Sequence, residues 1–213
     1  DEVLYRLLGR WLGGGRPGLD GRPDEGIAVI AFAHYADTRA PLTLAHGQVI
    51  DAARHLTFAQ GDDDGTAIGA ALALAVQRVQ DLHTRSKVVV LLTDGESNVH
   101  DIDEDDAIRD AVAAGVKVYT IGAGKNGVAP ICADGRLAQM PVSIDETLLR
   151  RIASKTGGAY FRATDAASLA SIYQQIDKLE RTQISGQTYG RYRQFYAIPL
   201  AIEQAGGEVT RFG

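Results

Sequence analysis

A run of five aliphatic residues, Val88 to Leu92, restricts the fold of this chain more than any other feature. The run lacks polar alternation, which is typical of a strand whose two faces are both covered, as at the centre of a parallel sheet. Thr93, Asp94 and Gly95 follow at the carboxyl end of this strand, where open α/β sheets bind their ligands. Asp94 is therefore either a site residue or a turn residue, because Asp-Gly is also a common turn pair.

The composition is that of an ordinary globular domain and excludes one class of partner. The 213 residues are 45% hydrophobic and 23% charged, with 22 Lys and Arg against 27 Asp and Glu. A net charge of -5 provides no basic surface, so we expect no nucleic-acid partner. The single cysteine, Cys132, excludes an internal disulfide framework and has no partner in a metal-like spacing.

Strand and helix patterns alternate along the chain. Apolar runs predict strands at Ile27 to Phe32 and Val116 to Ile121, with short strands at Arg39 to Leu44 and Ala159 to Arg162. Helical spacing predicts helices over residues 1–12, 47–58, 66–79, 103–114 and 165–180, and a further helix that ends near Gly157 after Ser143 and Glu146 in capping-box spacing. This order predicts a mostly parallel α/β sheet with helices on both faces.

Five motifs in a fixed order carry a family resemblance. They are Gly65-Thr66-Ala-Ile-Gly69, Leu91-Leu-Thr-Asp-Gly95, Val118-Tyr-Thr-Ile-Gly-Ala-Gly124, Ile144-Asp-Glu-Thr-Leu-Leu-Arg150 and Thr156-Gly-Gly-Ala-Tyr-Phe161. Together they resemble the von Willebrand factor type A (VWA) domain over roughly Ile27 to Glu180. Pro41 to Leu44 and Ile172 to Glu180 resemble the bacterial, membrane-associated branch that includes the Bat aerotolerance proteins.

The resemblance implies a Rossmann-like, non-enzymatic protein-binding module with a metal-ion-dependent adhesion site (MIDAS) at the strand ends. By that pattern Thr66 supplies a hydroxyl ligand and Asp94 a carboxylate to Mg²⁺, or to Mn²⁺ or Ca²⁺. An acidic residue of the partner protein would complete the metal shell. The partner-binding rim would comprise Asp64, Gly65, Gly95, Glu96 and Ser97.

The sequence departs from the family at the first loop. The family carries Asp-x-Ser-x-Ser after its first strand, between the strands at Ile27 and Val88, and no such pattern occurs here. We expect that strand to precede Asp1 in a longer protein, so that its absence leaves two unpaired strand edges. We also expect weak metal binding or none, with the acidic run Asp62 to Asp64 as the only nearby substitute.

The C-terminal part is predicted to be a tail, so the chain divides into an N-terminally incomplete VWA-like domain, residues 1–180, and residues 181–213. In the tail, Arg191 and Arg193 precede the apolar run Ala197 to Ile202, as on approach to a membrane segment. The run is too short to cross a bilayer, which takes about 20 residues. We expect the whole protein to be associated with a bacterial membrane, with the VWA domain in soluble space. A surface strand or a disordered tail is the alternative.

Two other classes of function stay open, a hydrolytic or nucleotide-binding α/β enzyme and a scaffold with a degenerate metal site. Gly122 to Gly127 is a formal G-x-G-x-x-G, but Val128-Ala-Pro130 follows where a helix should open. Ser97 lies outside a G-x-S-x-G elbow, and the histidines lack ligand spacing. We therefore predict a binding module rather than an enzyme; substrate turnover would contradict this prediction.

Overall fold

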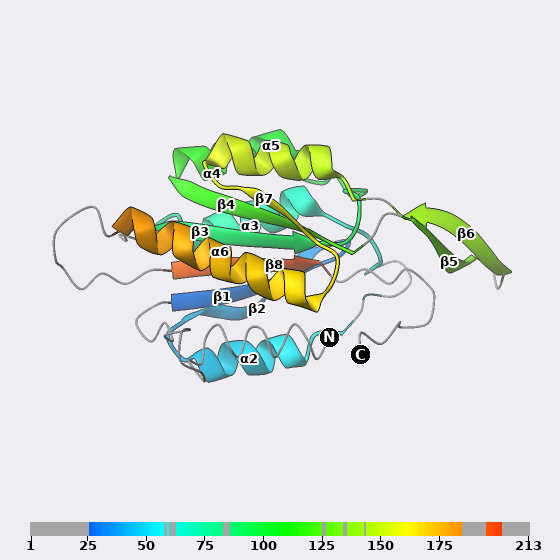
Figure 1. The fold of residues 1–213 in the computed structure, drawn as a ribbon, viewed down its shortest axis with the longest axis horizontal. Helices are drawn as coiled ribbons and strands as arrows, with labels where there is room; N and C mark the ends of the chain where they lie inside the picture. The colour runs from blue at the N-terminus through cyan, green and yellow to red at the C-terminus, as the bar shows by residue number, and fades with distance from the viewer. Residues whose placement is uncertain are drawn as a thin grey trace.

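The computed structural model describes residues 26–57, 59, 63–82, 86–124, 127–133, 136–142, 144–184 and 195–201. These residues form a six-stranded sheet between two helical layers, and a separate two-stranded hairpin (Figure 1). The helix predicted over residues 1–12 lies outside them. Within these ranges, no helix combines the length and the apolar composition that crossing a membrane requires.

The sheet is parallel except at one edge. Its order is β2-β1-β8-β3-β4-β7, in which β2 runs antiparallel to β1 and every other neighbouring pair is parallel. The strands are β1 (Gly26–Phe32), β2 (Ala36–Thr43), β3 (Lys87–Thr93), β4 (Val116–Ala123), β7 (Tyr160–Ala163) and β8 (Phe195–Ala201). The predicted mostly parallel, Rossmann-like architecture is therefore confirmed.

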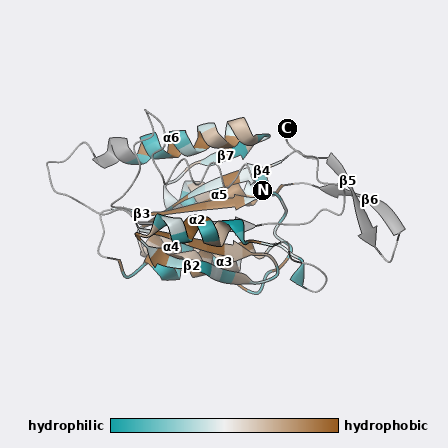
Figure 2. Ribbon diagram, turned by 90° about the horizontal axis from the view of Figure 1, so that it is seen from below, coloured by the Kyte–Doolittle hydropathy of each residue, from teal (hydrophilic) through white to brown (hydrophobic). Residues whose placement is uncertain are grey.

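Successive side chains of β3 enter two different cores. Val88 and Val90 pack with α2 (His46–Arg54) and α6 (Ala166–Ile184) on one face. Val89 and Leu91 pack with the helices of the other face, which are α3 (Ile68–Val79), α4 (Glu104–Ala113) and α5 (Glu146–Thr156). Both faces of the strand are covered, which explains its lack of polar alternation. In Figure 2 the strands between the helical layers are largely brown.

Side-chain caps fix the starts of α4 and α5. Asp103 precedes α4 and accepts hydrogen bonds from the N–H groups of Asp105 and Asp106 at 2.8 and 3.3 Å, as the acidic first turn predicts. The cap of α5 is Asp145, whose Oδ1 accepts from the N–H of Leu148 at 2.9 Å. The capping box was predicted to start at Ser143, which lies outside the described residues, whereas the cap is Asp145.

The centre of the sheet differs from the sequence-based expectation. We predicted two unpaired strand edges between β1 and β3, but β8 lies there and runs parallel to both. Residues 195–201 are thus part of the sheet, and the prediction of a tail outside the domain was wrong for them. The sequence did not indicate this pairing because β8 lies far from both of its partners along the chain. The domain boundary at residue 180 stays a prediction.

A hairpin follows β4 that the sequence analysis did not predict. β5 (Gly127–Ala133) and β6 (Arg136–Val142) pair antiparallel and form a sheet of their own (Figure 1). The G-x-G-x-x-G motif at Gly122 to Gly127 therefore leads from one strand into another. A dinucleotide fingerprint opens a helix at this point, and the strand β5 confirms the expectation that no helix follows the motif.

Candidate ligand-binding site at the carboxyl edge of the sheet

Asp94 lies where the central strand β3 ends. Thr93, the last residue of the strand, is fully buried, and its Oγ1 accepts a hydrogen bond from the N–H of Gly95 at 3.3 Å. Asp94 between them is half-buried, with its Oδ1 buried. The turn is thus stabilised by the hydroxyl of Thr93, and both roles considered for Asp94, in the turn and in a site, stay predictions.

Thr66 is positioned at the same edge by the end of β1. The N–H of His34, just after β1, donates to the carbonyl oxygen of Asp63 at 3.1 Å. Gly65 has a φ of +153°, and an added Cβ would lie 2.8 Å from Cγ2 of Val99 and 3.3 Å from Cα of His34. Glycine is needed here because a side chain would displace the loop. The loop leaves Thr66 fully buried just before α3 begins.

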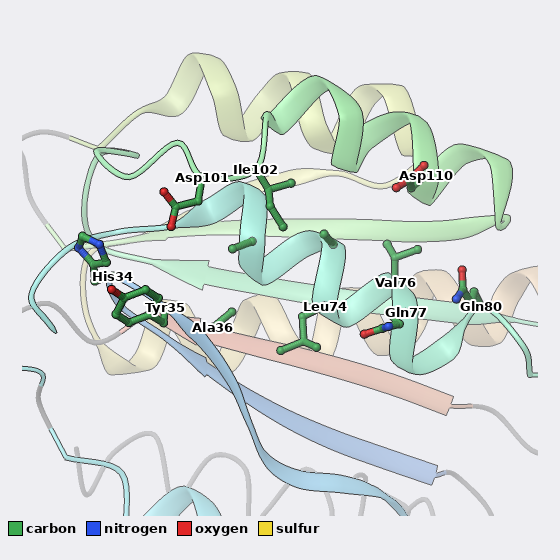
Figure 3. A pocket seen from close by; sticks show the side chains of 12 residues that line it. His34, Tyr35, Ala36, Leu74, Val76, Gln77, Gln80, Asp101, Ile102 and Asp110 are labelled. Carbon is green, nitrogen blue, oxygen red and sulfur yellow. The ribbon is translucent and has the colours of Figure 1, made fainter.

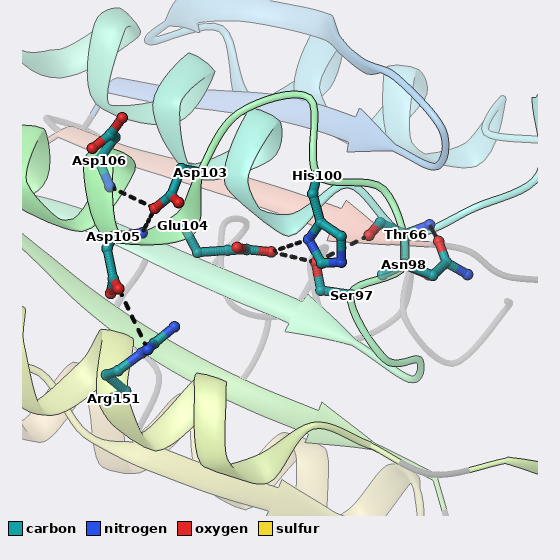
Figure 4. Close-up of polar contacts among 9 residues, drawn as sticks. All are labelled: Thr66, Ser97, Asn98, His100, Asp103, Glu104, Asp105, Asp106 and Arg151. Carbon is teal, nitrogen blue, oxygen red and sulfur yellow. Dashed lines mark hydrogen bonds and ion pairs between the residues drawn. The ribbon is translucent and has the colours of Figure 1, made fainter.

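Three hydrogen bonds join Thr66 to the loop that follows Asp94 (Figure 4). The N–H of Thr66 donates to Oδ1 of Asn98 at 2.7 Å. The carbonyl oxygen of Thr66 accepts from the N–H of Asn98 at 3.2 Å and from Oγ of Ser97 at 3.4 Å. The two predicted metal ligands therefore lie on loops whose relative position is fixed by hydrogen bonds.

Glu104 holds this loop from the first turn of α4. Its Oε1 accepts a hydrogen bond from Oγ of Ser97 at 2.6 Å and lies 3.0 Å from Nδ1 of His100 (Figure 4). Burial acts to raise the pKa of Glu104, but hydrogen bonds from Ser97, from its own backbone and from His100 bring it below the ordinary value. In this chain of contacts the carboxylate lies between serine and histidine, whereas a serine hydrolase requires the histidine to contact the serine hydroxyl. The cluster is therefore suited to fixing the loop.

The described residues contain both of the side chains that were predicted to bind a metal ion. Thr66 and Asp94 contribute one hydroxyl and one carboxylate, which is fewer than the six oxygen ligands of Mg²⁺. In the part of the chain that the structure describes, no group of three or more His, Cys, Asp or Glu could hold an ion. Asp63 and Asp64 are exposed, and Asp62 lies outside the described residues. Metal binding by Thr66 and Asp94 thus stays a prediction, and these two residues do not complete a site alone.

The predicted partner-binding rim contains residues of different accessibility. Asp64 and Glu96 are exposed, Gly65 and Gly95 are buried, and Ser97 is half-buried with its hydroxyl directed to Glu104. The accessible part of the rim is therefore acidic, and its role in binding stays a prediction. The sequence analysis did not identify Asn98 and Glu104, which position the loop. Asn98 lies 32 residues from Thr66, so their spacing gave no signal.

A groove of about 580 Å³ begins beside this edge and follows α3 (Figure 3). His34, Tyr35 and Asp101 line the end near this edge, Ile102 lies a little further along, and Gln80 lies at the far end. Tyr35 is 64% exposed and Ile102 39% exposed. Together they place exposed apolar surface beside the polar side chains of His34 and Asp101.

The family assignment follows from a match over most of the chain. The von Willebrand factor type A domain matches residues 17–175. The span includes all five motifs and both predicted ligands. The chain therefore belongs to the von Willebrand factor type A family, and the resemblance inferred from the motifs is confirmed.

Known relatives are longer than this chain. A UPF0353 protein of Mycolicibacterium paratuberculosis is 31% identical over 163 residues, which cover 73% of this chain and 48% of the relative. The chain spans about half the length of the curated relatives it matches, 55% and 48%.

Solved structures share the fold. An aerotolerance-related membrane protein from Bacteroides fragilis matches with a TM-score of 0.63 and 23% identity, over 82% of this chain and 86% of that protein. Proximal thread matrix protein 1 from the mussel byssus, with a zinc-occupied MIDAS motif, matches with a TM-score of 0.58 and 23% identity, over 84% of this chain and 39% of that protein. At these identities the comparison shows a common fold.

Proposed function

We propose that this chain is a non-enzymatic module that binds another protein at the carboxyl edge of its sheet. One observation carries the proposal: Thr66 and the loop after Asp94 are joined by hydrogen bonds through Asn98 and Ser97. Loops on a rigid sheet are common places for recognition, because the scaffold positions them while their sequence is free to vary. The exposed Asp64 and Glu96 and the groove along α3 extend the surface available to a partner.

We propose that a divalent cation takes part where a full set of ligands is present. Thr66 and Asp94 would then hold Mg²⁺, Mn²⁺ or Ca²⁺ through oxygen atoms, and an acidic side chain of the partner would complete the shell. The zinc-occupied MIDAS motif of the mussel protein supports a metal in a domain of this fold. In this chain the two residues alone make a weak site.

We further propose that the whole protein works in a membrane-associated bacterial complex, with this domain in soluble space. The membrane protein of Bacteroides fragilis that shares the fold supports this location. The resemblance of Pro41 to Leu44 and Ile172 to Glu180 to the Bat branch supports it as well.

A pull-down with a matched pair of variants tests the binding role. Immobilised wild-type chain, Asp94→Ala and Asp51→Ala would each be incubated with a bacterial membrane extract, in Mg²⁺ and in chelator. Asp51 is an exposed carboxylate of α2, which packs on the other face of the sheet, and controls for general charge. We expect Asp94→Ala to lose proteins that the wild type and Asp51→Ala retain, while all three chains unfold at similar urea concentrations.

Two results would contradict the proposal. Retention of the same proteins by all three chains would show that Asp94 is not part of the binding surface. A loss of stability in Asp94→Ala as large as that of a core truncation, about 2–5 kcal/mol, would show a structural role instead.

A further inference from the structure

The groove along α3 combines a floor of small residues with exposed apolar surface. Ala70 and Ala73 of α3 lie half-buried in its lining (Figure 3). Small side chains allow the backbone of a bound segment to come close to the helix. Tyr35 and Ile102, which are 64% and 39% exposed, add apolar surface that a bound segment would cover.

The floor of the groove is a helix, and this favours a helical occupant. The backbone N–H and C=O groups of α3 bond within the helix, so that apart from its ends it has none to share with a bound segment. An extended segment would turn unpaired backbone groups towards the apolar lining, whereas a helix satisfies its own. The 12 residues of α3 extend over about 18 Å, which matches an occupant of about three helical turns.

Two acidic residues of the groove have no function inside the chain. Six acidic residues occur from Asp101 to Asp110. Four of them cap α4, accept the hydroxyl hydrogen of Ser97 or pair with arginines: Asp103, Glu104, Asp105 and Asp106. The other two, Asp101 and Asp110, are exposed and line the groove, and their side chains form no hydrogen bond or ion pair with a described residue.

The two carboxylates lie apart along the groove. Asp101 lies at the end near the strand edge, and Asp110 lies toward the end at Gln80 (Figure 3). The six residue steps from Glu104 to Asp110 along α4 amount to about 9 Å, so the two carboxylates are on the order of two helical turns apart. The described lining contains no lysine or arginine. Negative charges beside apolar surface favour a partner that carries positive charges at a matching spacing.

We propose that the groove along α3 binds a basic amphipathic helix of the partner protein. The apolar stripe of that helix packs on α3 and on the exposed apolar surface, and two of its Lys or Arg residues, about seven positions apart, pair with Asp101 and Asp110. The inference rests on the proposed function for a protein as the partner, and it adds the chemistry of one segment. It uses neither Thr66 nor Asp94.

Peptide binding to the full 213-residue chain, measured by fluorescence anisotropy, tests the proposal. The probe is a fluorescein-labelled helical peptide of about 16 residues, with leucines at i, i+3, i+4 and i+7 and two lysines seven positions apart on one flank of the leucine stripe. We expect saturable binding to the wild type. An exposed ion pair changes affinity by about two- to fivefold, so the double variant Asp101→Asn, Asp110→Asn should bind about four- to 25-fold more weakly.

A matched pair of substitutions tests where the peptide binds. Gln77 is an exposed residue of α3 that lines the groove, and Gln174 is an exposed residue of α6 on the other face of the sheet. Gln77→Lys would place a positive charge next to the lysines of the peptide and should weaken binding by at least about two- to fivefold. Gln174→Lys should leave binding unchanged, and urea unfolding checks that both variants fold.

Several results would overturn the proposal. They are no saturable binding to the wild type, equal binding by the wild type and the double variant, and equal binding of a peptide with glutamates in place of the lysines. Equal binding of a peptide with two central prolines would exclude a helical occupant. A dimer of the chain that the peptide dissociates, seen by analytical ultracentrifugation, would assign the groove to a second copy instead.

Asp94→Ala separates this proposal from the proposed function. The variant should bind the peptide as tightly as the wild type, because the groove does not use Asp94. If it also retained every protein in the pull-down, the binding role of the sheet edge would fail while the groove stood. If the double variant at Asp101 and Asp110 bound the peptide normally, the groove would fail while the sheet edge stood.

Discussion

Glu180, at 1% exposure, is the one buried charged side chain among the residues whose burial the structure describes. Its carboxylate accepts hydrogen bonds from Nζ of Lys117 at 2.7 Å, from the hydroxyl of Tyr119 at 2.5 Å and from Oγ of Ser86 at 3.0 Å. It thereby joins α6 to β4 and to the start of β3. Glu180→Ala would remove the carboxylate and leave Lys117 and Tyr119 without this acceptor. We expect the free energy of unfolding, measured with urea, to fall by about 3–5 kcal/mol.

Two further substitutions separate the charge of Glu180 from general effects on α6. Glu180→Gln keeps an acceptor of similar shape, so it should cost less than Glu180→Ala. Gln174→Ala, at an exposed position of the same helix, should change the unfolding free energy by less than about 0.5 kcal/mol. If Glu180→Ala cost no more than Gln174→Ala, the contacts of Glu180 would not stabilise the fold.

Glu104 should make the stability depend on pH in the acid range. Its pKa in the folded chain lies below the ordinary value of 4.5, so the unfolded chain takes up the proton first as the pH falls. The stabilising contribution is complete above 4.5 and is lost as the pH falls through the lower folded pKa. The wild type should therefore lose more unfolding free energy on acidification than Glu104→Gln. Urea unfolding at a series of pH values measures the unfolding free energy of the wild type and of Glu104→Gln. If the two chains lost the same free energy on acidification, Glu104 would not be the source of the pH dependence.

At the scale of elements, two glycines in equivalent helix positions offer a direct comparison. Gly47 and Gly69 are the second residues of α2 and α3. A Cβ on Gly69 would lie 2.0 Å from the carbonyl oxygen of Ile102, whereas a Cβ on Gly47 would meet nothing within 4 Å. Gly69→Ala would push the loop before α4 away from α3, and we expect a loss of about 1–3 kcal/mol.

Gly47→Ala should instead be neutral or stabilise by up to about 1 kcal/mol, because alanine favours a helix over glycine. Thermal and urea unfolding of both variants check the difference. If Gly69→Ala and Gly47→Ala changed the unfolding free energy equally, the close approach of α3 to Ile102 would not require a glycine at position 69.

The elements also show which parts of the fold the sequence can predict. β1 and β3 were predictable because both of their faces are buried, which gives continuous apolar runs. β8 has a similar apolar run, but the preceding Arg191 and Arg193 favoured an approach to a membrane over a central strand. The pairing of β8 with β1 and β3 depends on how the whole chain folds, and no local sequence pattern indicates it.

At the scale of the whole molecule, the site was predictable only in part. Thr66 and Asp94 were selected as candidates because each lies in a motif that the family shares, next to a glycine. The contacts that hold the two loops together were not found, since Asn98 and Glu104 belong to no motif. Hydrogen bonds between residues far apart in sequence depend on the folded sheet, which brings the ends of β1 and β3 to one edge.

The incomplete ligand set leads to a prediction for the whole chain, which should bind divalent metal weakly or not at all. Thr66 and Asp94 carry one formal negative charge between them, and Mg²⁺ releases its water molecules reluctantly. Affinity for hard cations depends on the number of carboxylates, and the exposed Asp63 and Asp64 would have to fold back toward Asp94 to contribute. Calorimetric titration with Mg²⁺ and Mn²⁺ should therefore show no saturable binding in the micromolar range. The Asp94→Ala variant measures the background. Micromolar binding that Asp94→Ala abolishes would show that other residues of the chain complete the site around Asp94.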